Sequence, residues 1–141
     1  MSDKRVDPNE TAGNMEDRFH PPGDFNISNV STVGAQATAT GAAGVGGQKK
    51  VVTGFQFRIG ANVQLGAATI GCYVIDGASG GGTYLYREVI AITTTGAALH
   101  LTGLSILGTA NTAVTIEFSA GLAGATESVN LQYHHLAGAG A

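Results

Sequence analysis

Apolar and polar residues alternate one by one along several stretches of the chain, and this pattern predicts β-strands. The clearest alternation runs through residues 114–118 (VTIEF), and similar ones occupy residues 55–59 and 129–133. A repeat of two places one side of a strand against a core and the other side toward solvent. We therefore expect Glu117 to face solvent. The apolar positions of these stretches are expected to be buried, in particular Phe57, Ile116, Phe118 and Leu131.

Less regular apolar runs lie at residues 69–75, 83–92 and 98–107, and a weaker candidate strand lies at 26–30. The stretch 34–47 is compatible with a loop or with an edge strand. Clusters rich in glycine and small polar residues, typical of turns, separate the runs: residues 76–82, 94–97, 108–111 and 120–125. Six or seven short strands without an amphipathic helix predict an all-β fold, an antiparallel β-sandwich or jelly roll.

The charged residues are concentrated near the N-terminus. Nine of the 17 charged residues lie within residues 1–24, together with all three prolines. We therefore divide the chain into an extended or flexible N-terminal arm, residues 1–24, and a β-sandwich body, residues 25–141. A disordered tail is the alternative interpretation of the arm. The N-terminus lacks the apolar stretch of a secretory signal, and no run of about 20 apolar residues predicts a membrane span.

The body is almost uncharged. Its 117 residues carry eight charged side chains, about 7%, whereas ordinary globular domains have roughly 25%. The body also contains no proline and, after Lys50, no lysine, so the usual protection of edge strands is largely missing. These edges either close within the fold or are covered in an assembly. We expect a homo-oligomer with closed symmetry, and we favour a trimer.

Side chains that carry chemistry are scattered. His134 and His135 are neighbours on one expected strand, so they point to opposite faces and cannot bind the same ion. Motifs for zinc binding, phosphate binding or a serine nucleophile are missing from the sequence. Cys72 lies in an apolar run, and we expect it to be buried as a small hydrophobic residue. The acids of the body fall on separate segments: Asp76, Glu88, Glu117 and Glu127. We expect neither an enzyme nor a metal or cofactor site.

Nucleic-acid binding is not expected either, because the doublet Lys49–Lys50 is the only basic pair outside the arm.

Three stretches of the body carry a more specific signal: VIDGASGGGTYLY (Val74–Tyr86), LHLTGLSILGTANTAVTIEFSAG (Leu99–Gly121) and ATESVNLQYHH (Ala125–His135). Through these stretches the chain, from about Lys50 to Tyr133, resembles a family of small virion proteins of tailed bacteriophages. The arm lies outside this resemblance.

The resemblance implies a structural protein of the virion, and its most specific form is capsid decoration. Phage decoration (cement) proteins are commonly compact β domains, often trimeric, that bind the outer capsid lattice and bridge neighbouring major capsid protein subunits. The chain would then be made in the host cytoplasm and act on the outer capsid surface. We expect the arm to contact the major capsid protein, because extended segments can pair with exposed strand edges. The candidate contact residues are Lys4, Arg5, Arg18 and Phe19.

The alternative is a host-recognition module, the tip of a head or tail fibre that binds cell-surface glycan. In that hypothesis Tyr84, Tyr86 and Tyr133 form a platform on which sugars stack. Polar contacts would come from Asn130, Gln132 and His134. Tyrosines also fill the cores of β-sandwiches and contacts between subunits, which is the competing interpretation of the three rings.

Overall fold

The computed structural model describes residues 25–61 and 63–136, and the regular structure in this part of the chain is entirely β-strand. The candidate arm residues Lys4, Arg5, Arg18 and Phe19 lie outside the described residues. The strands are β1 (Phe25–Val30), β2 (Thr38–Gly41), β3 (Lys49–Ala61), β4 (Ala68–Asp76), β5 (Tyr84–Ile92), β6 (Gly96–Leu101), β7 (Ile106–Leu107), β8 (Val114–Phe118) and β9 (Ala125–Leu136).

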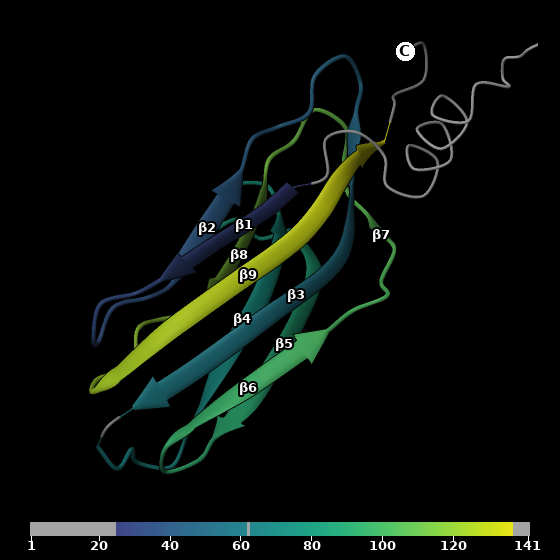
Figure 1. Ribbon diagram of the computed structural model, residues 1–141. Helices are drawn as coiled ribbons and strands as arrows, with labels where there is room; N and C mark the ends of the chain where they lie inside the picture. The colour runs from purple at the N-terminus through teal and green to yellow at the C-terminus, as the bar shows by residue number, and fades with distance from the viewer. Residues whose placement is uncertain (1–24, 62, 137–141) are drawn as a thin grey trace, which may run out of the picture.

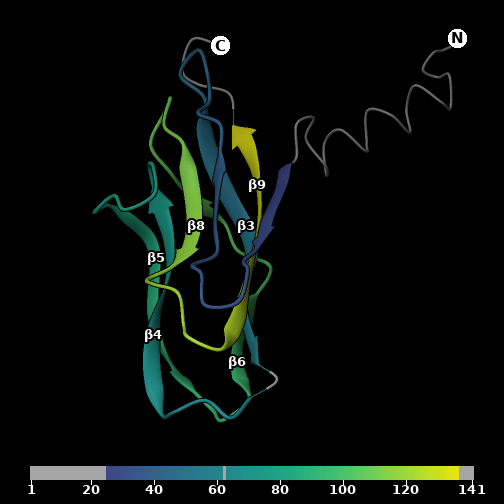
Figure 2. The ribbon, with the colours of Figure 1, turned by 90° about the vertical axis from the view of Figure 1, so that its left-hand side faces the viewer.

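The strands form two antiparallel sheets that pack face to face (Figures 1 and 2). One sheet has the order β1-β9-β3-β6, with β7 added beside β3, and the other has the order β2-β8-β4-β5. The chain passes from one sheet to the other at most connections; only the pairs β4–β5 and β6–β7 follow each other within a sheet. This strand order is that of a jelly roll, a double-sheet β-sandwich. The predicted fold class is confirmed.

The core lies between the two sheets. Phe57, Ile116, Phe118 and Leu131 are each 0% exposed, as the alternation predicted. Phe57 packs edge-on against Phe55 at 5.5 Å and against Phe118 at 5.3 Å between ring centroids. These rings join the sheets, since Phe57 comes from β3 and Phe118 from β8. Burial of large aromatic side chains contributes much of the stability of such a core.

Two ambiguous stretches are resolved by the structure. The stretch 34–47 contains a short edge strand, β2, that pairs with β8, and the residues around it form connections. The apolar run 98–107 is divided between β6 and β7. The division falls at Gly103, whose φ of 69° lies in the left-handed region, which glycine adopts readily. Both β6 and β7 pair with β3, so the run stays on one sheet.

The loop between β4 and β5 folds over the outer side of β8. Glu117, which was expected to face solvent, is only 4% exposed, and that expectation is wrong. Its carboxylate accepts hydrogen bonds from the Ser79 hydroxyl, from the Gly80 N–H at 3.2 Å and from the Thr38 hydroxyl at 3.1 Å. The neighbouring Thr115 hydroxyl donates to the Gly77 carbonyl at 2.9 Å. Alternation placed Glu117 on the correct side of the strand, but this loop covers that side.

Candidate functional site

Buried charges reduce the charge of the surface further than the sequence indicated. Lys50 and Glu127 are 0% exposed and Glu117 is 4% exposed. Of the eight charged side chains of the body, five therefore reach the surface or lie partly at it: Lys49, Arg58, Asp76, Arg87 and Glu88. Valines are instead strongly exposed, with Val45 at 72% and Val33 at 70%. The described surface of the body therefore combines few charges with several singly exposed apolar side chains.

The acids do not come together in a catalytic arrangement. Asp76 accepts hydrogen bonds from the Thr109 N–H, with 3.1 Å to each carboxylate oxygen, and also from the Thr109 hydroxyl. It therefore fixes the connection that leads from β7 to β8, although an aspartate at the start of a glycine-rich turn more often binds the backbone of its own turn. Within residues 25–61 and 63–136, no group of three or more His, Cys, Asp or Glu side chains is arranged to hold a metal ion.

Glu127 lies on β9 with its side chain between the sheets. One carboxylate oxygen, Oε1, accepts a hydrogen bond from the Ala37 N–H at 3.0 Å, and the other, Oε2, has no hydrogen-bond partner among the described residues. Burial raises the pKa of Glu127 from its usual 4.5 to about 6, although the bond from Ala37 opposes the shift. Because the carboxyl binds its proton more tightly in the folded protein, its contribution to stability is greatest at low pH and falls as the pH rises from about 4.5 to 6.

We expect Glu127→Gln to remove this pH dependence while keeping an acceptor for Ala37. The free energy of unfolding of the variant, relative to the wild type, should rise by about 1–2 kcal/mol between pH 4 and pH 7. Urea titrations at a series of pH values measure it. His135 is present in both proteins, so its own titration cancels. The control is Glu88→Gln, at an exposed position. If the difference in the free energy of unfolding between wild type and Glu127→Gln did not change with pH, the Glu127 carboxyl would be hydrated.

A second buried polar side chain is that of Lys50 on β3, which pairs with the other end of β9. Lys50 lies directly opposite His135 in the register of β3 and β9. Within residues 25–61 and 63–136, neither Lys50 Nζ nor His135 Nε2 has a hydrogen-bond partner. Burial lowers the pKa of Lys50, against the opposing effect of the Asp76 carboxylate. Burial also lowers the pKa of His135, assisted by the Lys50 charge. The doublet Lys49–Lys50 is thus one exposed and one buried lysine.

The three tyrosines proposed as a platform for sugars do not share a surface. Tyr133 is 3% exposed and stacks on Phe25 at a centroid distance of 5.0 Å. Tyr86 packs against the core ring of Phe55 at 4.6 Å. Tyr84 alone of the three is clearly exposed, at 38%, and its neighbour is Tyr73, which sequence reasoning did not consider. The position of Tyr133 in the alternation of β9 was the signal that it points inward.

The outer side of the β1-β9-β3-β6 sheet is polar in its middle. Asn26 and Asn130 are joined there through their side-chain amides. A row of polar residues crosses four strands in register: Ser28, Asn130, Gln56 and His100. A hollow of about 260 Å³ beside this row is lined by Phe25, Asn26, Thr53, Gln132 and Tyr133. Asn130 and Gln132 are therefore on the side that the glycan hypothesis requires.

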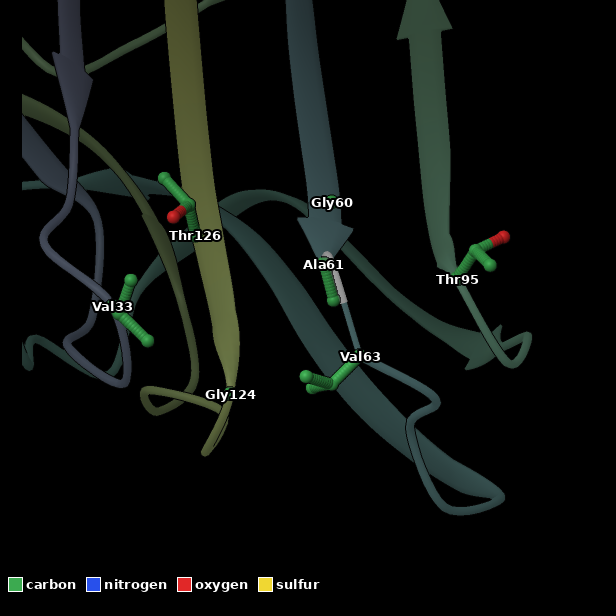
Figure 3. A pocket seen from close by; sticks show the side chains of 7 residues that line it. All are labelled: Val33, Gly60, Ala61, Val63, Thr95, Gly124 and Thr126. Carbon is green, nitrogen blue, oxygen red and sulfur yellow. The ribbon is translucent and has the colours of Figure 1, made fainter.

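A larger hollow of about 630 Å³ lies where β3 ends and β9 begins (Figure 3). Its lining is made of small or apolar residues: Val33, Gly60, Ala61, Val63, Thr95, Gly124 and Thr126. Among the described residues that line the hollow, none carries a titratable side chain. The hollow offers space for an apolar side chain.

Comparisons with known proteins do not identify a family for this chain. No protein-family model and no curated protein matches the sequence. The described part of the chain has no helix with the length and apolar character needed to cross a membrane. Among solved structures, one described as "CBM4 structure and function" is similar with a TM-score of 0.36 and 12% identity. The alignment covers 72% of this chain and 61% of that chain, which is less than two thirds of its length.

Proposed function

We propose that this chain is a structural protein of a phage virion, most specifically a capsid decoration protein that bridges neighbouring major capsid protein subunits. The proposal begins with the resemblance of residues from about Lys50 to Tyr133 to small tailed-phage virion proteins. The observation that carries it furthest in the structure is the surface of the body, where five charged side chains accompany strongly exposed valines. A surface of this kind favours a permanent place in a protein assembly.

Bridging requires a rigid body and several modest contacts that act together. The jelly roll is the rigid part, and linked contacts strengthen each other because later binding steps occur at high effective concentration. We propose a homotrimer, in which exposed residues on an edge strand, such as Val30 on β1, are covered. Light scattering on the purified protein should give the mass of three chains. A mass of one chain would contradict the proposed homotrimer.

We further propose that the arm, residues 1–24, contributes to capsid binding through Lys4, Arg5, Arg18 and Phe19. The charges would pair with capsid acids, so binding should weaken as salt screens them over about 8 Å near physiological ionic strength. The test adds the full chain and a chain lacking residues 1–24 to capsids stripped of this protein, followed by pelleting and counting of bound copies. Undiminished binding of the shortened chain would place the contact on the body.

The polar outer side of the β1-β9-β3-β6 sheet favours a second candidate function, glycan binding by a host-recognition module. Amide side chains such as Asn26 and Gln132 suit sugar hydroxyls, and the partly exposed Phe25 lies beside them. Copy number separates the candidates, because a decoration protein is present in many copies per virion and a fibre tip in few. Saturable binding of the purified protein to host cells would favour the second candidate.

A further inference from the structure

A cluster of two tyrosines and an arginine lies on the outer side of β4 and β5. Arg87 lies opposite Tyr73 in the register of the two strands. Its guanidinium carbon, Cζ, is 5.7 Å from the ring centroid of Tyr73 and 5.2 Å from that of Tyr84. The two rings are 5.0 Å apart between centroids and tilted by 51°. At such distances both rings attract the cation and restrict its motion.

The strand beneath the cluster is shaped to hold it. The Tyr73 ring lies over Gly71, and a Cβ atom at Gly71 would stand 2.5 Å from the Tyr73 hydroxyl and 2.8 Å from a ring carbon. The ring therefore occupies space that a larger residue would take. Val89, opposite Gly71 on the same side of the sheet, is 55% exposed. We name these four residues, Tyr73, Tyr84, Arg87 and Val89, the β4–β5 face.

Among the described residues, no carboxylate forms an ion pair with Arg87. Within the described residues, the contacts of the Arg87 guanidinium are the two tyrosine rings. Arg87 is exposed, so its N–H groups remain available to a partner. A guanidinium that is already oriented loses less freedom when it binds, and its planar fork matches a carboxylate in two parallel hydrogen bonds.

We propose that the β4–β5 face is the surface through which the body docks on its protein partner, with a partner carboxylate bound to Arg87; this rests on the proposed capsid role and makes the major capsid protein that partner. Charge complementarity selects an acidic site on the partner. Tyrosine and arginine are enriched among the residues that dominate binding energy at protein interfaces, and Val89 adds apolar contact next to them.

The same face is less suited to sugar. Stacking of a sugar needs an open aromatic surface, but the Tyr73 and Tyr84 rings are inclined to each other and both hold the guanidinium. A carboxylate can bind the Arg87 guanidinium without any rearrangement of the two rings. Arg87-dependent binding to an acidic polysaccharide, with no binding to capsids, is therefore an outcome that would overturn the inference.

The experiment measures binding of the full chain and its variants to capsids stripped of this protein. Arg87→Ala should weaken binding at least about tenfold, a loss expected for a central interface residue. Arg58→Ala is the matched control, because Arg58 is also exposed but lies on β3 in the other sheet. Equal losses for the two variants would indicate nonspecific attraction and would overturn the inference.

Two further variants test the geometry rather than the charge. Arg87→Lys keeps the charge but lacks the planar fork, so its binding should fall between those of wild type and Arg87→Ala. Gly71→Ala should displace the Tyr73 ring and weaken binding several-fold, while thermal unfolding confirms that the protein is folded. If wild type binds capsids and Arg87→Ala binds equally well, this inference fails and the capsid role stands. If wild type does not bind, the capsid role itself fails.

Discussion

Replacing Phe118 by alanine should lower the free energy of unfolding by about 3–5 kcal/mol. Phe118 is 0% exposed and packs edge-on against Phe57 of the opposite sheet, so its removal leaves a cavity at the contact between the sheets. Natural domains are stable by only about 5–15 kcal/mol, and the variant should therefore populate unfolded chains at moderate temperature. Urea denaturation followed by circular dichroism measures the loss.

The matched control for this change is Leu107→Ala. Leu107 is 51% exposed on β7, so the same kind of truncation removes little buried surface. Its effect should stay below about 1 kcal/mol, as for other surface changes. Similar losses for Phe118 and Leu107 would contradict the packing of β8 against the opposite sheet.

Replacing Gly96 by alanine should destabilise the protein by about 3 kcal/mol or more, because two costs add. Gly96 has a φ of 145°, a conformation that residues with a Cβ rarely adopt. A Cβ atom there would also lie 2.0 Å from the carbonyl oxygen of Ile59, which belongs to the backbone of β3. The turn cannot easily move away, since Gly96 and Thr93 exchange backbone hydrogen bonds of 3.0 and 3.3 Å.

Gly60, which pairs with Gly96 across β3 and β6, is the control for this substitution. A Cβ atom at Gly60 would meet no heavy atom within 4 Å, so Gly60→Ala should be nearly neutral. Thermal unfolding of the two variants gives the comparison directly. A Gly96→Ala protein as stable as Gly60→Ala would mean that the β5–β6 turn has a different geometry.

Much of the fold could be predicted because alternation reports on which side of a strand a residue lies. The stretch 114–118 shows this well, since Ile116 and Phe118 point into the core as expected. The division of strands between two sheets, and hence the jelly-roll order, could be predicted only as a class. Pairing β1 with β9 joins residues about a hundred positions apart, and local pattern contains no information about such partners.

The three buried charges could not be predicted for a related reason. Alternation does not say whether another segment covers the outer side of a sheet, as the β4–β5 loop does at Glu117. Lys50 and Glu127 point inward near the two ends of the sandwich, where a charged residue is usually assumed to turn outward. Their burial depends on how the ends of the sandwich are closed, which is a property of tertiary structure.

The candidate site shows the same limit. Tyr84 was identified from the sequence as a surface ring, but its partner Tyr73 lies in an apolar run and gave no separate signal. Arg87 was noted only as one of the charges of the body. The cluster arises because β4 and β5 form a hairpin whose register sets Arg87 opposite Tyr73, and a bulge between Val74 and Ile75 shifts the pairing so that Tyr84 lies opposite Ile75.

The covering of β8 by the β4–β5 loop also decides where foreign peptides can be inserted for display. Three consecutive glycines at positions 80–82 make this loop look permissive, but Ser79 and Gly80 are bonded to the buried Glu117. An insertion there would uncover a carboxylate and separate it from its donors. The tip of the β2–β3 connection is the better place, because Val45 is 72% exposed and the bonds there, from the Gly47 N–H to Asn111 Oδ1 and between Val45 and Gln48, hold no buried charge. A cargo attached at that tip would leave the hydrogen bonds of Glu117 in place.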